Sequence, residues 1–527
     1  MPPLPASEEQ VPLTGNAAPV DEQAFKQLLE RRAQTLLALA AHLAQCPHPR
    51  QALTRPLAGE LLSNSMQLEE LLDTYEAGKN CAWCALRSLT ATMKSFSDIS
   101  YELLHIHHRA PSYRLLPLER DFVAATNEAL EFTSTMLAHA AAEMLAQARS
   151  LGLNVLQRPD IEGTYEERFV QGLFPRHCGA RQVETVAETV TLLATAFLNL
   201  ASESEDIRAV RRTRPQDYAA LIAPALSEER LRSLEFQFHN LQSQYDTYVA
   251  GTEAERQDTD LPALRGHASV VFHLLRTATL FAHYYERHVN KQRCAASSFV
   301  KFMVEPEALL SVLMNYSITF IDLYIGRAVT LCQEMLKRYE EEGTIDVPIP
   351  KYRGFHVRPS TLISKLVLHY GSKVQMLLGE EVYDASSPLD LFRANEKINA
   401  QKRRWLAKEI ARLGLVPERS AVEDPIAVVR SVVLALAEKS QLVMYEQPLE
   451  LPERICGGEG TLLESVTSET GRLLAMGKID IGIDVTVRFV GDKRVLADIQ
   501  LLAEHGYGED NFGNNIALPK KLGYLRR

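Results

Sequence analysis

Hydrophobic residues recur at intervals of three and four positions from Asp21 to about Glu342, which is the spacing of one buried helix face. Alanine, leucine, glutamate, glutamine and arginine dominate this region, and all are strong helix formers. The predicted helices cover residues 21–45, 56–78, 82–108, 117–151, 182–203, 226–250, 262–290 and 306–341. No repeat period runs through them, so residues 21–342 are expected to form an all-α helical bundle, either single or divided into two subdomains near residues 204–215.

The pattern changes at about Gly343. Residues 344–349 alternate like a short strand, which Pro348 confines to an edge or a strand end. A helix at 359–370 and a β-hairpin, 373–378 with 381–383, are predicted next. The remaining predicted elements are a helix at 386–412, a strand at 440–447, a helix at 460–476, a strand at 484–490 and a helix at 494–504. This mixture predicts a C-terminal α/β domain at 343–527 and therefore a multidomain chain.

Length and composition agree with a globular protein of several domains. The 527 residues are 46% hydrophobic and 24% charged. A net charge of −10 indicates neither nucleic acid nor an anionic membrane as a partner, and basic clusters such as Lys402-Arg403-Arg404 are expected to be solvated surface. Residues 1–20 are rich in proline and polar side chains, which predicts a disordered tail.

Two further features bear on location. The chain begins without the basic and apolar segments of a signal peptide, and its seven cysteines are scattered, which indicates reduced thiols and the cytoplasm. The most apolar run, from about Leu309 to Leu331, is interrupted by Asn315, Asp322 and Arg327. We therefore expect it to be a buried helix and not a membrane span.

The candidate chemistry lies between Gly354 and Thr361. His356 stands just before Pro359, and proline is favoured in the first turn of a helix, so His356 is predicted near a helix N-cap. Free amide groups and the positive end of the helix dipole stabilise an anion there, and Arg358 adds a permanent guanidinium charge. A neutral imidazole is a nucleophile, so the pattern is compatible with phosphoryl transfer on His356. On this spacing alone, a histidine before a helix is more often only a cap or surface residue.

The run Gly354-Phe355-His356-Val357-Arg358-Pro359 resembles the signature Gly-[Leu/Phe]-His-x-Arg-Pro of the histidine phosphocarrier protein (HPr) of the phosphoenolpyruvate:sugar phosphotransferase system. The order of the predicted strands and helices is also similar. The resemblance implies an open-faced β-sandwich of four antiparallel strands with three helices on one face. It implies that His356 is the phosphorylated residue and Arg358 neutralises the phosphate. Pro359 and Ser360 would begin the first helix.

The chain departs from the family pattern after the hairpin. Residues 386–460 stand between the hairpin and the helix that best matches the family's second helix, so they are predicted to be an inserted, mostly helical subdomain. Many family members carry a regulatory serine at the start of that helix. Distance from the hairpin selects Ser386 or Ser387, whereas counting back from the last strand selects Glu469, and both alignments stay open. The tail at 507–527 is also additional and is expected to be an ordered loop or a flexible end.

The resemblance implies a cytoplasmic phosphocarrier or regulatory protein, a carrier of phosphohistidine and not a turnover enzyme. An enzyme I-like protein would be the donor, the acceptor or regulated protein is unknown, and no cofactor, metal, nucleic acid or membrane span is expected. The alternative is a non-catalytic interaction protein that uses the helical bundle and a retained HPr-like fold. A metal or redox role would need Glu102, His105, Cys81 and Cys84, but only one copy of each half-site is present, so these are expected to be structural.

Overall fold

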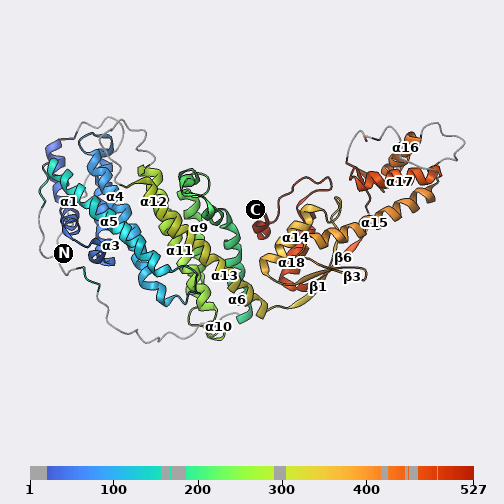
Figure 1. Cartoon of the computed structure of the whole chain (residues 1–527), viewed down its shortest axis with the longest axis horizontal. Coiled ribbons are helices and arrows are strands. Elements are labelled where there is room, and N and C mark those ends of the chain that lie inside the picture. Colours follow the sequence, from blue (N-terminus) through green and yellow to red (C-terminus); the bar gives the residue numbers. More distant parts are fainter. Residues whose placement is uncertain are drawn as a thin grey trace, which may run out of the picture. The chain divides into compact units, whose positions relative to one another are not determined.

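The computed structural model describes residues 20–155, 165–167, 185–289, 304–416, 425–445, 449, 451, 461–482 and 485–526 (Figure 1). The chain divides into two compact units. The first comprises residues 1–183 and 204–328, and the second comprises residues 184–203 and 329–527. The predicted tail at 1–20 falls outside the described residues except for Val20.

The first unit is helical throughout its described part, in agreement with the periodic pattern. Its helices are α1 (Glu22–Gln45), α2 (Pro49–Ala52), α3 (Arg55–Thr74), α4 (Cys84–Arg109), α5 (Phe122–Ser150), α7 (Glu205–Ala209), α8 (Tyr218–Leu221), α9 (Glu228–Tyr248), α10 (Glu253–Gln257), α11 (Leu261–Tyr284), α12 (Pro306–Val312) and the first half of α13 (Thr319–Arg338). Side chains of Asp21, Thr54, Asp121 and Ser227 accept hydrogen bonds from the first-turn amides of α1, α3, α5 and α9. The predicted starts of α1, α3 and α9 lie within two residues of the observed ones, whereas α5 begins five residues later than predicted, after its Asp121 cap.

The helical segment Pro306–Arg338 joins α12, a π-helical stretch at Leu313–Ile318, and α13. By length and composition alone this segment could cross a membrane, and 67% of its most apolar window is buried in the protein. The core helix of a globular unit has the same properties, and burial of this extent is what such a helix requires.

The second unit contains an antiparallel sheet in the order β1-β6-β2-β3, formed by β1 (Glu342–Pro348), β2 (Val374–Leu378), β3 (Glu381–Asp384) and β6 (Thr486–Asp492). Phe489 in the centre pairs with Ile345 on one side and with Met376 on the other. Burial alternates along β6, because the side chains of Val487 and Phe489 enter the core while their neighbours face out. One face of the sheet is thus covered and the other is open.

Helices α6 (Val186–Glu203), α14 (Val357–Tyr370), α15 (Pro388–Leu413) and α18 (Lys493–Glu504) complete the body of this unit. Helix α14 packs against α15 and α18, and α18 packs against β1 and β6. Pro348 ends β1, as its ring requires, and the sheet places β1 at an edge.

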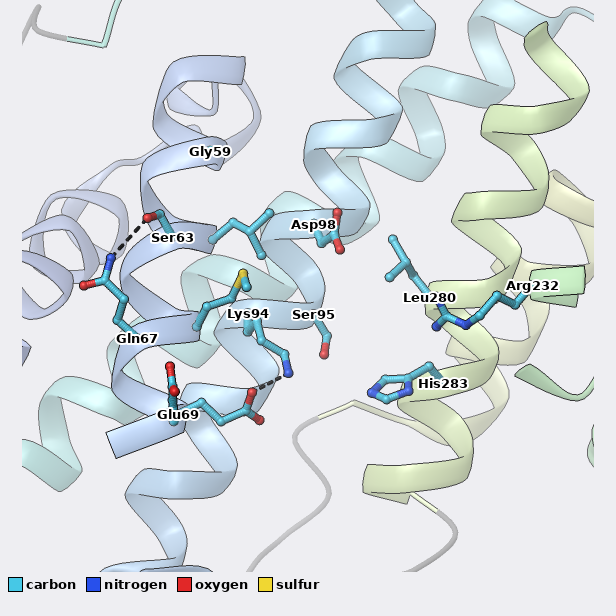
Figure 2. Close-up of a pocket in the computed structure, with 13 residues that line it drawn as sticks. Gly59, Ser63, Gln67, Glu69, Lys94, Ser95, Asp98, Arg232, Leu280 and His283 are labelled. Carbon is cyan, nitrogen blue, oxygen red and sulfur yellow. Dashed lines mark hydrogen bonds and ion pairs between the residues drawn. The ribbon is translucent and has the colours of Figure 1, made fainter. Parts of the chain in front are cut away.

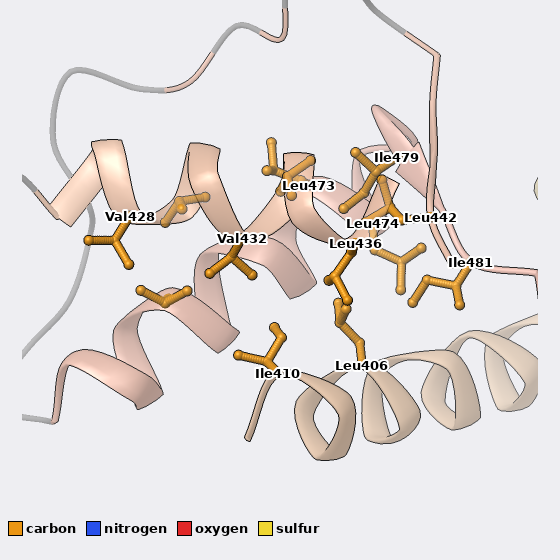
Figure 3. Close-up of a cluster of buried hydrophobic side chains, with 13 residues drawn as sticks. Leu406, Ile410, Val428, Val432, Leu436, Leu442, Leu473, Leu474, Ile479 and Ile481 are labelled. Carbon is orange, nitrogen blue, oxygen red and sulfur yellow. The ribbon is translucent and has the colours of Figure 1, made fainter. Parts of the chain in front are cut away.

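A separate hydrophobic cluster is formed by the end of α15, α16 (Pro425–Glu438), α17 (Leu462–Ala475) and the two-residue strands β4 (Val443–Met444) and β5 (Ile479–Asp480) (Figure 3). We call this part the α16–α17 subdomain. Of the predicted strand at 440–447, residues 446 and 447 lie outside the described residues, and 440–445 contain only the two residues of β4; α16 and β5 were not predicted. Helix α15 begins next to β3 and ends in this cluster, so one helix joins the sheet to the subdomain (Figure 1).

Candidate functional site

His356 is the N-cap residue of α14, as the sequence predicts. Its backbone is extended, and its carbonyl accepts the first helical hydrogen bond, from the Ser360 N–H at 3.2 Å. Pro359 in the first turn has no N–H to donate. The amides of Val357 and Arg358 are therefore the donors that this end of the helix can offer to an anion.

The loop before His356 is clamped from α15. Gly354 has a φ of +62°, and a Cβ there would lie 2.2 Å from Asn395 Oδ1, so the position requires glycine. The Asn395 side chain accepts from the Phe355 N–H at 2.9 Å and donates to the Arg353 carbonyl at 3.1 Å. Ser360, predicted to start the helix, donates from its hydroxyl to the Phe355 carbonyl at 2.9 Å. These bonds fix the backbone from which the imidazole projects.

A buried ion pair between Lys402 and Asp480 also holds the same loop. Asp480 in β5 accepts from the Arg353 N–H at 3.0 Å and from Lys402 Nζ at 2.7 Å. The Lys402 and Asp480 side chains are 2% and 4% exposed. The prediction that the basic cluster at 402–404 is solvated surface is therefore wrong for Lys402. Its methylene stem lies in the packed face of α15, and its charge is neutralised inside the protein.

The imidazole of His356 has three neighbours. Nδ1 donates to the Gly354 carbonyl at 3.1 Å, the Tyr352 ring meets it edge-on at 5.4 Å, and Nε2 lies 3.3 Å from Oε2 of Glu509. Arg358, predicted to neutralise the phosphate, places Nη1 3.7 Å from the same Glu509 oxygen. The His356 side chain keeps 24% of its surface exposed. His356 and Arg358 are thus brought together, and both face a carboxylate.

Glu509 was not among the predicted site residues. It belongs to the C-terminal tail, which is ordered here, and its side chain is only 2% exposed. No spacing rule connects a residue in the tail with a histidine so much earlier in the chain. The glycines at 506, 508 and 513 were the available signal, since they predicted an ordered loop as one of two readings of the tail.

The candidate regulatory positions lie apart in the unit. Ser387 is the N-cap of α15, and its hydroxyl accepts from the Asp390 N–H at 3.3 Å. Ser386, which like Ser387 is half-buried, donates its N–H to Asp384. Glu469 lies in the middle of α17, is 4% exposed and pairs with Arg472. Only the two serines stand at the start of a helix that follows the hairpin.

Of the residues that a metal or redox role would need, Glu102 and His105 lie one turn apart near the end of α4 and both contact His273, whereas Cys84 begins the same helix and Cys81 precedes it. Glu102 is buried and engaged by His273 at 2.9 Å and Arg276 at 2.8 Å. Burial raises the pKa of this carboxyl, but the His273 hydrogen bond and the positive charges outweigh burial, so the net shift is downward. Burial lowers the pKa of His105 to about 4. Cys81 is exposed and Cys84 is half-buried. Within the described residues, no group of three or more histidines, cysteines or carboxylates could hold a metal ion.

A cleft of about 700 Å³ in the first unit lies between α3, α4 and α11 (Figure 2). Among the charged side chains that line it, Lys94 contacts Glu69, Arg232 pairs with Glu228 and Asp98 pairs with Arg276. Glu70 also lines the cleft and is exposed.

Comparison with known proteins adds no relative to this picture: no family model matches the chain, and neither curated proteins nor solved structures give a match.

Proposed function

We propose that this protein is a phosphocarrier or phosphorylation-dependent regulatory protein that accepts a phosphoryl group on His356. One observation carries the proposal: a partly exposed imidazole projects from the N-cap residue of α14, and its Nε2 and Nη1 of Arg358 lie near the same Glu509 oxygen at the N-terminal end of this helix. The helix N-terminus and the guanidinium each favour the extra negative charge that a phosphoryl group brings.

The architecture of the second unit supports an HPr-like domain. Its larger sheet has four antiparallel strands and one covered face, and α14, α15 and α18 stand in the chain positions of the family's three helices. Helix α15 directly follows the hairpin and has Ser387 as its N-cap. Taking α15 as the family's second helix puts Ser386 and Ser387 at its start, which favours them over Glu469 in α17 as the regulatory position. In this alignment the insertion is the α16–α17 subdomain together with the elongated end of α15.

The chemistry is a direct transfer between proteins. A lone pair on one ring nitrogen of His356 attacks phosphorus, a P–N bond forms, and the bond from phosphorus to the donor breaks with its electron pair leaving on the donor. The donor class is an enzyme I-like phosphohistidine protein charged by phosphoenolpyruvate. Arg358 and the amides of Val357 and Arg358 stabilise the transferred anion. The reverse step would deliver the group to an acceptor.

The test is labelling with radioactive phosphoenolpyruvate through enzyme I of the source organism. Wild type and a His108→Ala control, an exposed histidine in α4, should both take up acid-labile, base-stable label, whereas His356→Ala should take up none. Arg358→Ala should lower the labelling rate by about 10- to 100-fold, because a charge-assisted contact is lost in the transition state. Label that persists in His356→Ala would contradict the proposal.

A second candidate is the interaction protein with a retained fold, and the position of Glu509 favours it. A buried carboxylate faces both His356 and Arg358, which is where a phosphate would have to bind. Under this reading no donor labels the protein, and the set of proteins recovered with it is the same for wild type and His356→Ala. A partner lost only in the unphosphorylatable variant would exclude it.

A further inference from the structure

Glu509 is held beside His356 by a built turn. Asp510 accepts from the Phe512 N–H at 2.8 Å and the Asn514 N–H at 2.9 Å, and Gly513 donates its N–H to the Asp510 carbonyl at 3.1 Å. A Cβ on Gly513 would lie 2.5 Å from the Tyr352 ring, so the turn lies directly on the aromatic side chain that flanks His356.

The segment is anchored on the other side of Glu509 as well. The Tyr507 side chain is buried, its hydroxyl donates to the Pro348 carbonyl at 2.7 Å, and its ring meets Phe355 edge-on at 5.9 Å. Its backbone has a φ of +58°, an unusual conformation for a residue with a side chain. The tail is thus fastened to the loop both before and after the carboxylate.

The carboxylate itself is incompletely bonded. Glu509 Oε1 is buried and has no hydrogen-bond partner among the described residues, and neither has Nη1 of Arg358. Buried polar atoms in proteins are nearly always bonded, so this pair is a poor permanent arrangement. A phosphoryl group, with three acceptor oxygens, could satisfy the guanidinium that one carboxylate oxygen reaches only at 3.7 Å.

Two anions cannot share this place. A phosphorus atom bonded to Nε2 would stand between that nitrogen and Glu509 Oε2, which lie 3.3 Å apart. If the phosphorus were instead bonded to Nδ1, it would displace the Gly354 carbonyl contact and still put about two negative charges beside a buried carboxylate. Nδ1 donates to a carbonyl, which only accepts, so a hydrogen bond from Nε2 to the carboxylate would also require a protonated, non-nucleophilic ring.

We propose that the segment His505–Ile516 is a built-in competitor for the phosphoryl site, with the Glu509 carboxylate standing in for the phosphate. The segment must leave before His356 reacts, and it stays released while His356 is phosphorylated. This regulation rests on the proposed function, because it concerns the reactivity of the same histidine. It couples the charge on His356 to the docking of the tail.

The test uses phosphoramidate, a small donor that needs no partner protein: its nitrogen leaves as ammonia when the P–N bond to histidine forms. The full-length chain is labelled as wild type, Glu509→Gln and Glu504→Gln, an exposed glutamate in α18 that serves as the matched control. Glu509→Gln keeps the shape of the side chain and removes its charge. It should label at least about tenfold faster than the other two, and His356→Ala should remain unlabelled.

Hydrogen exchange gives a second readout. Amides of 505–516 should be protected in unphosphorylated wild type and should lose protection on phosphorylation, whereas α18 should not change. Equal labelling rates in wild type and Glu509→Gln, or slower labelling of Glu509→Gln, would overturn the competitor and leave the carrier function standing. No label on His356 in any variant would overturn the carrier function and the competitor together.

Discussion

At the scale of single residues, Asn395 connects the fold to the chemistry. It bonds the Phe355 N–H and the Arg353 carbonyl, both in the loop that presents His356. Asn395→Ala leaves the buried Phe355 N–H and the part-buried Arg353 carbonyl without their partner, which should lower the free energy of unfolding by about 1–3 kcal/mol. The His356 loop should also become mobile. The rate of phosphoramidate labelling and the rate of amide hydrogen exchange at 353–356 should therefore change together.

Asn399→Ala is the matched control for this prediction. Asn399 is half-buried on the same helix, one turn further on, and its substitution should change stability by less than about 0.5 kcal/mol. Equal effects of the two substitutions would show that the clamp contributes nothing specific to the loop.

Lys402 is the second residue whose contact decides the geometry of the loop. Lys402→Met retains most of the apolar stem but leaves the buried charge of Asp480 without its cation. Removing one partner of a buried pair should lower the free energy of unfolding by about 3–5 kcal/mol. In a double-mutant cycle, Asp480→Asn should recover part of this loss, and urea unfolding would measure it. Additive effects would contradict a direct pairing.

At the scale of elements, the α16–α17 subdomain is held by aliphatic packing. Leu436 in α16 is fully buried in the cluster (Figure 3). Leu434 in the same helix is 45% exposed. Leu436→Ala should destabilise the subdomain by about 2–5 kcal/mol, and Leu434→Ala should have little effect. Of the two tryptophans in the chain, Trp405 packs against this cluster. Its fluorescence in a Trp83→Phe background therefore reports the unfolding of the α16–α17 subdomain. Similar losses for both variants would mean that the cluster is not the core of the subdomain.

The elements that the sequence predicted share a visible periodicity. Helices such as α1 and α4 have regular apolar stripes, and β6 alternates cleanly, so local pattern alone located them. Helix α16 was missed because its buried face is made largely of Val428, Val429, Val432 and Val433. Valine has a low helix propensity, and packing against α15 and α17 overrides it.

The candidate site shows the same division between local and distant information. His356, Arg358, Pro359 and Ser360 are neighbours in sequence, and a cap position follows from proline and helix periodicity. Asn395, Asp480 and Glu509 come from three other segments. Their approach depends on the tertiary path of the chain, which no spacing rule describes. The lysine at 402 was misread because charge alone predicts exposure, while a buried carboxylate reverses that expectation.

At the scale of the whole molecule, buried histidines should set the acid stability of each unit. In the first unit, His267 is fully buried, and burial lowers its pKa to about 4. Its Nε2 accepts a hydrogen bond from the Leu116 N–H at 3.2 Å. A proton on that nitrogen would point at this N–H donor and would break the hydrogen bond. In the second unit, burial likewise lowers the pKa of His369 to about 4, although the charge of Asp498 opposes the shift.

The direction in which stability changes with pH depends on whether the folded or the unfolded chain binds more protons. Unfolded histidine has a pKa of about 6.5, so between pH 6.5 and about 4 the unfolded chain holds more protons than the folded chain. Stability is fully present above pH 6.5 and falls as the pH drops through this window, by up to about 1.4 kcal/mol per pH unit for each such histidine. His105, whose pKa is also lowered to about 4, adds to the slope of the first unit.

His267→Gln isolates one of these contributions, because glutamine can accept from the Leu116 N–H but does not titrate. Trp83 is buried in the first unit, so its fluorescence in a Trp405→Phe background follows urea unfolding there. Between pH 6.5 and 4.5 the variant should lose stability less steeply than the parent, by up to about 1.4 kcal/mol per pH unit, and above pH 7 the two should run parallel. An unchanged slope would mean that His267 accepts its proton in the folded state at its ordinary pKa, which its burial and its Leu116 donor both oppose.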